Sequence, residues 1–501
     1  MTALVAGAPS NAGLKWKQVN WTAVRAHVYQ LQVRIAKAIR DERWNKAKAL
    51  QHLLSRSFAA KLLAVKMVIS NKGSRTPGVD GVKWRTPRQR WLAAIALQSR
   101  GYRAQPLRRI DIPKKNGQTR PLGIPTLHDR AMQALFALGL KPIAETTADS
   151  HSYGFREYRS LHDAIKQAFI SLATKVAAPW ILEADIKACF DRISHDWLLE
   201  NIPLPKRILR QWLKSGYISA SELHETKAGT PQGGIISPIL CNMTLDGLQS
   251  VVIKGRYDKK RRKLNIIRYA DDLIVTGASP EILLNEIKPE LEHFLQLRGL
   301  TLSEEKTKLS HINEGFDFLG FNIRKYQQKL LVKPERSKSK TLRDKVKALL
   351  NQYRGVSFQV MLLKLNSVLR GWAYAHRQVV AKKIMSRLDN DIFKLVCKWL
   401  RKAHRNKTWS WISKRYRKRY RGRWQFMQVY PTAKGTVKTV CLFRLSDLPI
   451  RYHNKIRSEA TPYDPEYWDY FKRRKAWHQR MANKDRAFLN ASAFDKMAVW
   501  R

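Results

Sequence analysis

The sequence has few acidic residues, few cysteines and no long apolar run, and each shortage narrows the class of protein. It carries 39 Asp and Glu against 95 Lys and Arg, which gives a formal net charge of +56. A charge of this size far exceeds what solubility needs, and a bound polyanion would relieve its self-repulsion. We therefore expect nucleic acid as the partner. An anionic membrane surface is the weaker alternative, because the sequence has no long basic amphipathic helix with a bulky apolar face.

The four cysteines stand far apart, at positions 189, 241, 397 and 441, and no two of them form a C-x-x-C pair. This spacing fits a reducing compartment and argues against a structural zinc site. The longest apolar runs fall well short of the roughly 20 residues of a membrane-spanning helix. The first residues also lack the basic start and apolar core of a secretion signal.

Hydrophobic spacing divides the chain into regions. From residue 20 to about 71, apolar residues recur at helical spacing, with Asn20 as the expected N-cap. Between residues 77 and about 324, short apolar runs alternate with helical patterns and Gly-rich turns, which indicates a mixed α+β domain. From residue 333 to about 400 the pattern is helical again. The length of 501 residues leaves room for about three domains.

Residues 401–424 form the most basic stretch. They contain 11 Lys and Arg and no acid, interleaved with Trp409, Trp411, Tyr416, Tyr420 and Trp424. Cations bind phosphates and rings stack on bases or sugars, so we expect this stretch to contact nucleic acid. A solvated charged face is the alternative.

Two adjacent carboxylates, Asp271 and Asp272, stand between the strand-like segments 264–269 and 273–276, which places them at the tip of a β-hairpin. Asp at a hairpin turn is common for purely local reasons. A third acid, Asp185, ends another buried-strand pattern. Two adjacent strand ends that each present an acid can hold two divalent cations about 4 Å apart, which would activate a 3′-hydroxyl and stabilise a leaving pyrophosphate. The pattern therefore predicts that these acids bind magnesium.

Several motifs follow one another along the chain. In order they are SRTPGVDG (74–81), PLRRIDIPKKNGQTRPLGIPTLHDRAMQ (106–133), SYGFR (152–156), ADIKACFD (184–191), AGTPQGGIISPIL (228–240), RYADD (268–272), LTLSEEKTKL (300–309) and GFDFLGF (315–321). With them, the chain from about Trp16 to about Phe471 closely resembles the reverse transcriptases that bacterial and organellar group II introns encode. So many collinear motifs leave little room for chance.

The resemblance implies an α+β right-hand polymerase fold. The implied parts are a helical N-terminal extension (1–75), fingers and palm (76–325), a helical thumb or maturase domain (326–400), a basic DNA-binding domain (401–480) and an unmatched tail (481–501). Many relatives continue into an endonuclease domain with paired C-x-x-C knuckles and clustered histidines. After Tyr463 this sequence has one histidine, His478, and no cysteine, so we expect that domain to be missing.

The resemblance also implies the catalytic residues. Asp185, Asp271 and Asp272 correspond to the catalytic acids of the palm, which bind two Mg²⁺ ions. Asp185 and Asp271 are the principal metal ligands in this correspondence, with Asp272 nearby. Either Lys306 or Lys308 would protonate the pyrophosphate, and the sequence does not decide between them.

Four residues would contact the incoming nucleotide. Lys114 and Arg120 lie in a loop that resembles the fingers hairpin, where they would neutralise the triphosphate, although an ordinary β-turn is the alternative. Phe190 matches the ring that crowds a ribose 2′-hydroxyl and so selects DNA as the product, although a core phenylalanine is the alternative. Gln232, in the Gly-rich loop 229–234, would contact the nucleotide or the primer end.

Two segments would bind longer nucleic acid. Arg370 and Trp372 lie in a helical segment, 365–376, that resembles the family's maturase region, and helix packing by Trp372 is compatible with that role. The stretch after 401 occupies the place of the DNA-binding region. Its predicted contacts are Lys414, Arg415, Arg417, Lys418 and Arg419.

The implied function is an RNA-directed DNA polymerase and maturase that binds its group II intron RNA, assists splicing and supports retrohoming. Expected partners are the intron RNA, target DNA, an RNA template with a DNA primer, and dNTPs, with no membrane. The expected location is the bacterial cytoplasm, in association with the nucleoid, and an organelle is the alternative. Two other functions stay open: an RNA-binding splicing factor with dispensable polymerisation, and a reverse transcriptase recruited to host defence.

Overall fold

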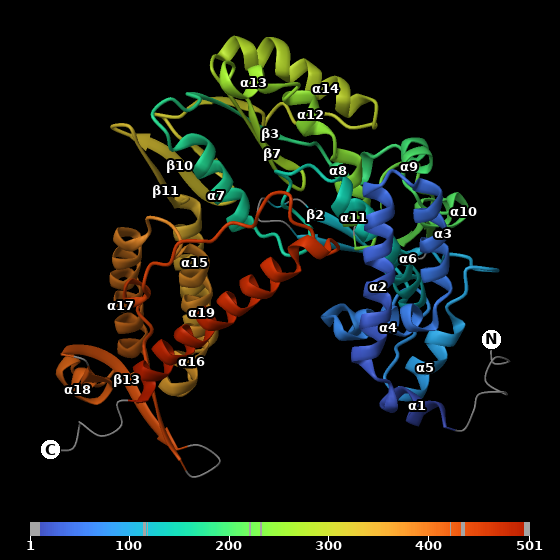
Figure 1. Cartoon of the computed structure of the whole chain (residues 1–501). Helices are drawn as coiled ribbons and strands as arrows, with labels where there is room; N and C mark the ends of the chain where they lie inside the picture. Colours follow the sequence, from blue (N-terminus) through green and yellow to red (C-terminus); the bar gives the residue numbers. More distant parts are fainter. Residues whose placement is uncertain are drawn as a thin grey trace. The chain divides into compact units, whose positions relative to one another are not determined.

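The computed structural model describes residues 11–113, 117, 119–219, 222–230, 233–420, 422–431 and 436–494 (Figure 1). The chain forms two compact units. Unit 1 comprises residues 1–167, 178–309 and 456–468, and unit 2 comprises residues 168–177, 310–455 and 469–501. None of the described helices is long and apolar enough to cross a membrane.

Helices build the N-terminal part of unit 1. They are α1 (Ala12–Gln18), α2 (Trp21–Arg40), α3 (Trp44–Arg56), α4 (Phe58–Ser70), a 3-10 turn (Lys72–Arg75) and α5 (Pro87–Ala96). Asn20 caps α2 as predicted, because its side-chain oxygen accepts hydrogen bonds from the backbone amides of Thr22 and Ala23. Helices α2, α3 and α4 pack on α6 (Leu127–Thr147), in which residues 131–140 are all buried. The predicted helical region therefore has its core against α6.

Two four-stranded sheets lie in unit 1, except that the last two residues of β8 (Lys308–His311) are counted with unit 2. The first, in the order β2-β1-β4-β5, consists of β1 (Leu107–Pro113), β2 (Thr119–Ile124), β4 (Tyr217–Ser219) and β5 (Glu222–His224). The second, in the order β6-β7-β3-β8, consists of β3 (Trp180–Asp185), β6 (Asn265–Tyr269), β7 (Asp272–Gly277) and β8 (Lys308–His311). Apolar residues of β3, β6 and β7 share one core with the helices, so the second sheet is a rigid platform for whatever its strand ends carry.

Short helices surround these sheets. They are α7 (Leu161–Leu172), α8 (Cys189–Arg192), α9 (His195–Asn201), α10 (Lys206–Leu213), α11 (Ser237–Leu245), α12 (Leu248–Val252), α13 (Arg256–Lys260) and a π-helical turn (Ile282–Ile287) that runs into α14 (Lys288–Gln296).

Unit 2 starts with a three-stranded antiparallel sheet and continues with helices. The sheet has the order β11-β10-β9 and consists of β9 (Phe316–Phe318), β10 (Phe321–Tyr326) and β11 (Lys329–Pro334). Helices α15 (Arg336–Gln352), α16 (Phe358–His376) and α17 (Lys382–Ala403) follow and pack together (Figure 1). The helical pattern predicted for residues 333 to about 400 is thus present as three helices, which begin directly after β11 ends at Pro334.

The rest of unit 2 contains α18 (Trp409–Tyr416) and a second small sheet, in the order β12-β13-β14, of β12 (Arg417–Tyr420), β13 (Arg423–Pro431) and β14 (Val437–Cys441). Two 3-10 turns (Leu445–Asp447 and Pro465–Tyr467) and α19 (Trp468–Phe494) complete the described chain. Within α19, Asp485 forms ion pairs of 2.8 Å with both Arg377 and Arg451. The tail that the family resemblance did not cover is therefore helical up to Phe494 and docks on unit 2.

Residues 456–468, the return segment, lie in unit 1 although unit 2 precedes them in sequence. The backbone amide of Ile456 donates to Asp163 Oδ1 at 2.8 Å. Asp464 forms an ion pair of 2.9 Å with Arg40 of α2. The return segment therefore connects α2 with Asp163 of α7 (Leu161–Leu172).

Candidate active site

Strands β6 and β7 form the hairpin that the sequence predicts for the two adjacent acids. Tyr269 pairs with Asp272, so Ala270 and Asp271 form a two-residue turn. Ala270 has a φ of +58°, in the left-handed region that residues with a Cβ rarely adopt. The backbone at Gly154 lies against this turn, since a Cβ there would come within 2.4 Å of the Ala270 nitrogen. The glycine of the SYGFR motif is therefore required by the position of the turn.

Asp185 ends β3 directly opposite Asp272 at the start of β7. Residues directly opposite each other in an antiparallel pair have their side chains on the same face. Burial raises the pKa of Asp271. Burial, together with the negative charges of Asp271 and Asp185, raises the pKa of Asp272 to about 7. The three acids singled out in the sequence thus lie together and repel one another.

A lysine lies against this cluster. Lys306 Nζ is 2.6 Å from Asp185 Oδ2, and this hydrogen bond raises the pKa of the Lys306 ammonium group. Lys308 is exposed at the start of β8, and its side chain makes no hydrogen bond or ion pair with the described part of the chain. Of the two lysines that the sequence leaves open, the structure brings Lys306 to the carboxylates.

The donor set suits a hard divalent cation. Carboxylate oxygens are the ligands that Mg²⁺ prefers, and a cation would relieve the repulsion that raises the pKa of Asp272. Among the described residues, no group of three or more His, Cys, Asp or Glu side chains is arranged so that it could hold a metal ion. The fit of Asp185, Asp271 and Asp272 to a divalent cation therefore rests on the chemistry of their carboxylates.

Two of the four residues predicted to contact a nucleotide lie in the described structure. Arg120 is exposed on β2, and its charge lowers the pKa of Asp271 in opposition to the larger effect of burial. Phe190, in α8, is half-buried against the core of unit 1, and its ring lies edge-on to Phe155 at 6.0 Å. Lys114 and Gln232 lie outside the described residues.

The two residues of the maturase segment have packing partners. The Arg370 guanidinium lies over the Phe443 ring at 5.7 Å, and the Trp372 ring stacks on His376 at 4.2 Å. Arg370 and Trp372 are both half-buried. Both side chains therefore pack within unit 2, and part of each remains exposed to solvent.

The basic stretch 401–424 is partly core and partly surface. The exposed predicted contacts are Lys414 and Arg415 on α18 and Lys418 and Arg419 on β12. Arg417 is half-buried, with its guanidinium 5.5 Å from the Phe393 ring centre. Tyr416 is buried and packs edge-on against Phe358 at 4.7 Å, so it is not available to stack on bases. Trp424, in contrast, is 61% exposed.

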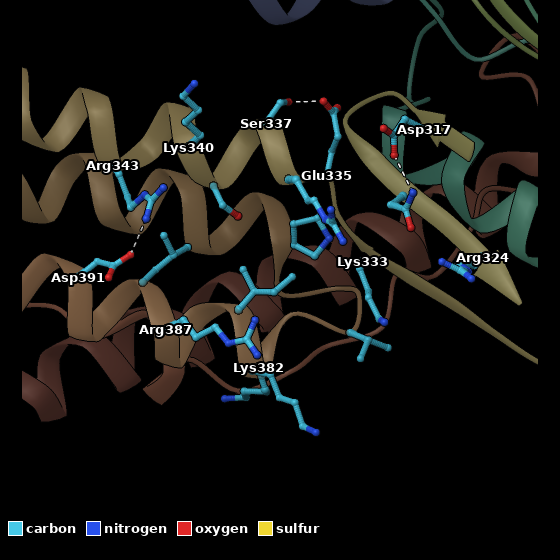
Figure 2. Close-up of a pocket in the computed structure, with 18 of the residues that line it drawn as sticks. Asp317, Arg324, Lys333, Glu335, Ser337, Lys340, Arg343, Lys382, Arg387 and Asp391 are labelled. Atoms are coloured by element: carbon cyan, nitrogen blue, oxygen red, sulfur yellow. Dashed lines mark hydrogen bonds and ion pairs between the residues drawn. The ribbon is translucent and has the colours of Figure 1, made fainter. Parts of the chain in front are cut away.

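The sequence reading missed a basic groove in unit 2, the α15–α17 groove (Figure 2). Its first section has a volume of about 1280 Å³. The lining includes the cations Arg336, Lys340 and Arg343 of α15 and Lys382, Lys383 and Arg387 of α17, and also the acids Glu314, Asp317, Glu335 and Asp391. A second section of about 650 Å³ follows along the same two helices, with Lys347, Arg354, Lys398, Lys402 and Arg405 and no acid. Positions 336, 340, 343, 347 and 354 recur at helical spacing, which is the sequence signal for one basic helix face.

Comparison with known proteins identifies the family. Residues 112–323 match the reverse transcriptase (RNA-dependent DNA polymerase) family, and residues 16–97 match the N-terminal domain of reverse transcriptase. Residues 339–417 match the group II intron maturase-specific domain. Over 307 residues the chain is 34% identical to Protein YkfC of Escherichia coli (strain K12), covering 52% of this chain and 79% of that protein. The chain belongs to the group II intron reverse transcriptases.

This reverse transcriptase is also 29% identical over 357 residues to the group II intron-encoded protein LtrA of Lactococcus lactis subsp. cremoris. That alignment covers 58% of this chain and 59% of the Lactococcus protein, so the chain spans about three fifths of that relative. Apo telomerase from Candida tropicalis aligns over 62% of this chain and 58% of its own, with 16% identity and a TM-score of 0.39.

Family membership confirms the predictions about class. The reverse transcriptase has the predicted α+β right-hand polymerase fold, is an RNA-directed DNA polymerase and carries a maturase domain. Its family uses divalent metal ions, binds RNA and extends a primer on a template. The domain boundaries and the roles of individual residues stay predictions.

Proposed function

We propose that this chain copies RNA into DNA at the cluster of Asp185, Asp271 and Asp272, and that it binds its intron RNA to assist splicing and retrohoming. The observation that carries the proposal is the placement of Asp185 opposite Asp272 across β3 and β7, with Asp271 at the adjoining turn. The proposed substrates are dNTPs and a DNA primer on an RNA template. Target DNA is the proposed further partner.

The three acids would bind the metal ions, and one lysine would donate a proton to the leaving group. Asp185 and Asp271 would hold two Mg²⁺ ions, with Asp272 beside them. When bound, the ions supply activation of the primer 3′-hydroxyl and stabilisation of the leaving pyrophosphate. Lys306, hydrogen-bonded to Asp185, holds a proton beside the cluster and would give it to the pyrophosphate as a general acid.

The remaining predicted residues would select and hold the nucleotide. Arg120, whose charge acts on Asp271, would neutralise the triphosphate together with Lys114. Phe190, near the surface beside Phe155, would exclude a 2′-hydroxyl. Gln232 would contact the nucleotide or the primer end.

The α15–α17 groove would bind the phosphates of duplex RNA. In the part of the chain that the structure describes, Arg336, Lys340 and Arg387 make no ion pair or hydrogen bond, so their charges are available. Figure 2 shows α15 and α17 residues facing each other across the groove, and Arg343 pairs with Asp391 at 3.2 Å. Arg370, Trp372 and the exposed cations of α18 and β12 would extend this surface toward intron RNA and target DNA.

Primer extension tests the polymerase part of the proposal. The wild-type chain, an Asp271→Ala variant and a Glu222→Ala variant would each receive a DNA primer on an RNA template, dNTPs and Mg²⁺. Glu222 is an exposed acid on β5 and serves as the matched control. Extension by the wild type and Glu222→Ala only is the expected result, with splicing assistance intact in all three. Extension by Asp271→Ala would refute the assignment.

Salt dependence tests the groove. Lys340→Ala combined with Arg387→Ala should weaken duplex RNA binding and lower the slope of log K against log salt by about 0.7–0.9 per lost phosphate contact. The control pair Lys259→Ala and Lys260→Ala removes two exposed charges from α13 in unit 1. If both pairs change the slope equally, the groove has no special role.

A further inference from the structure

A buried arginine joins the catalytic hairpin to the rest of unit 1. Arg268, on β6 two residues before the turn, is 2% exposed. Its Nη2 lies 2.5 Å from Oδ1 of Asp246, and its Nη1 donates to Oδ1 of Asn242 at 3.2 Å. Asn242 belongs to α11 and Asp246 follows its last residue. The strand that leads into the turn is thus fixed to the end of a helix that is not part of the hairpin.

Asn242 also holds the segment that backs the turn. Its Nδ2 donates to the Gly154 carbonyl at 2.8 Å. The backbone carbonyl of Arg268 accepts a hydrogen bond from the Tyr153 amide at 2.9 Å. The backbone amide of Arg268 donates to the His151 carbonyl at 3.0 Å. Gly154 in turn lies against Ala270. A continuous path of contacts therefore runs from Asp246 through Arg268 and Asn242 to the turn.

Stability alone does not explain this arrangement. A buried ion pair is often no more stabilising than well-packed apolar side chains of the same volume. Its hydrogen bonds are directional, however, and a partner of this kind orients the ligands of a metal. Arg268, the β6 member of this pair, stands three residues before Asp271 and four before Asp272, where orientation matters for metal binding.

We propose that Asp246 is a positioning residue of the polymerase site, which acts through Arg268 and Asn242 to fix the turn that carries Asp271 and Asp272. In this proposal Asp246 acts through its partners and would contact neither the metal nor the substrate. The inference rests on the proposed function of the two acids. It assigns a role in metal affinity to a residue 25 positions away from Asp271 in sequence.

The test compares two identical chemical changes. Oδ2 of Asp246 has no hydrogen-bond partner among the described residues, so Asp246→Asn keeps the shape and the Oδ1 acceptor. The substitution removes the ionisable carboxyl, whose pKa burial raises to about 7 against the opposing effect of Arg268. Asp258→Asn is the matched control, because Asp258 pairs with Arg262 at 3.2 Å. The Arg262 carbonyl accepts from Ala278 at 2.8 Å, so this second pair braces the opposite end of the same two strands.

Asp246→Asn should lower the primer-extension kcat about tenfold and leave the KM for dNTP unchanged. It should also weaken Mn²⁺ binding about tenfold, measured by electron paramagnetic resonance without nucleic acid. Asp258→Asn should leave both quantities near wild type even if its melting temperature falls. Wild-type kcat and Mn²⁺ affinity in Asp246→Asn, or parallel losses in Asp258→Asn, would overturn the proposal.

Two further variants keep the proposal testable. If Asp246→Asn does not fold, Asn242→Ala should show the same loss of Mn²⁺ affinity. Adding Asp246→Asn to Arg268→Gln should cause no further loss, because one residue acts through the other, and additive losses would refute the path. If the wild type extends no primer, the proposed function fails, while the Mn²⁺ comparison still decides the role of Asp246.

Discussion

Replacing Gly154 by alanine should displace the turn that carries Asp271, the proposed metal ligand. The new Cβ would lie 2.4 Å from the Ala270 nitrogen and 2.9 Å from the Tyr269 carbonyl carbon, whereas ordinary contacts of a Cβ fall between 3.4 and 4 Å. Both facing atoms belong to backbone, so neither can rotate away. One of the two segments therefore has to move by about 1 Å.

Two magnitudes follow from this displacement. Overpacking of this kind costs about 1–3 kcal/mol of unfolding free energy. Each 1 kcal/mol lowers the melting temperature of a unit of about 300 residues by about 1.5 °C. A misplacement of about 1 Å in the reacting geometry lowers the rate about 100-fold. We therefore expect kcat for primer extension to fall about 100-fold, with a moderate fall in melting temperature.

Gly13→Ala is the control for this experiment. Gly13 lies in helix α1 of the same unit, and its Cβ would meet no atom closer than 3.8 Å. Alanine should stabilise that helix by about 0.5–1 kcal/mol and leave kcat unchanged. Primer extension at steady state and a calorimetric melt measure both quantities. A Gly154→Ala variant with wild-type kcat and melting temperature would refute the reasoning about the turn.

Three other predictions concern the same site. Lys306→Ala should lower kcat about 100-fold, the usual contribution of a general acid, while Lys308→Ala should not, and equal effects in primer extension would contradict the assignment. Mg²⁺ binding to the protein without nucleic acid should release about half a proton at pH 7 and almost none at pH 9, because the pKa of Asp272 is about 7 and a metal favours its ionised form. Mg²⁺ affinity should accordingly rise as the pH rises through 7, and calorimetry in two buffers of different ionisation enthalpy checks both points. Phe190→Ala should lower the ratio of kcat/KM for dNTP over rNTP by about tenfold or more, and an unchanged ratio would leave Phe190 as a core residue.

The sequence predicts the acids well because local patterns determine where they lie. Asp185 ends one apolar strand, and Asp271 and Asp272 stand between two other apolar strands. The sequence alone therefore places all three acids at strand ends. The register that sets Asp185 opposite Asp272 was not predicted, because it depends on residues far apart in sequence. Asn20 was predictable for the same reason, since capping depends on a few neighbouring residues.

Long-range contacts were not predictable in this way. Asp246 and Arg268 are 22 residues apart, on a helix end and a strand, and nothing in their spacing indicates a pair. The choice of Lys306 over Lys308 depends on where the loop before β8 turns. Tyr416 lies in a basic stretch that suggests a surface, yet it is buried because α18 packs on α16 residue Phe358. The α15–α17 groove had a readable helical signal, but its second wall comes from a helix about 45 residues further on.

The return segment has a consequence for the order in which the chain becomes complete during synthesis. Ile456 and its partner Asp163 are 293 residues apart, which is about 15–60 s of translation at the usual rates. Most of unit 1 emerges from the ribosome before residues 310–455, but the segment that ties its N-terminal helices in place emerges after them. A nascent chain therefore cannot complete unit 1 until residues 310–455 have been made, so a ribosome that stalls within them leaves unit 1 incomplete.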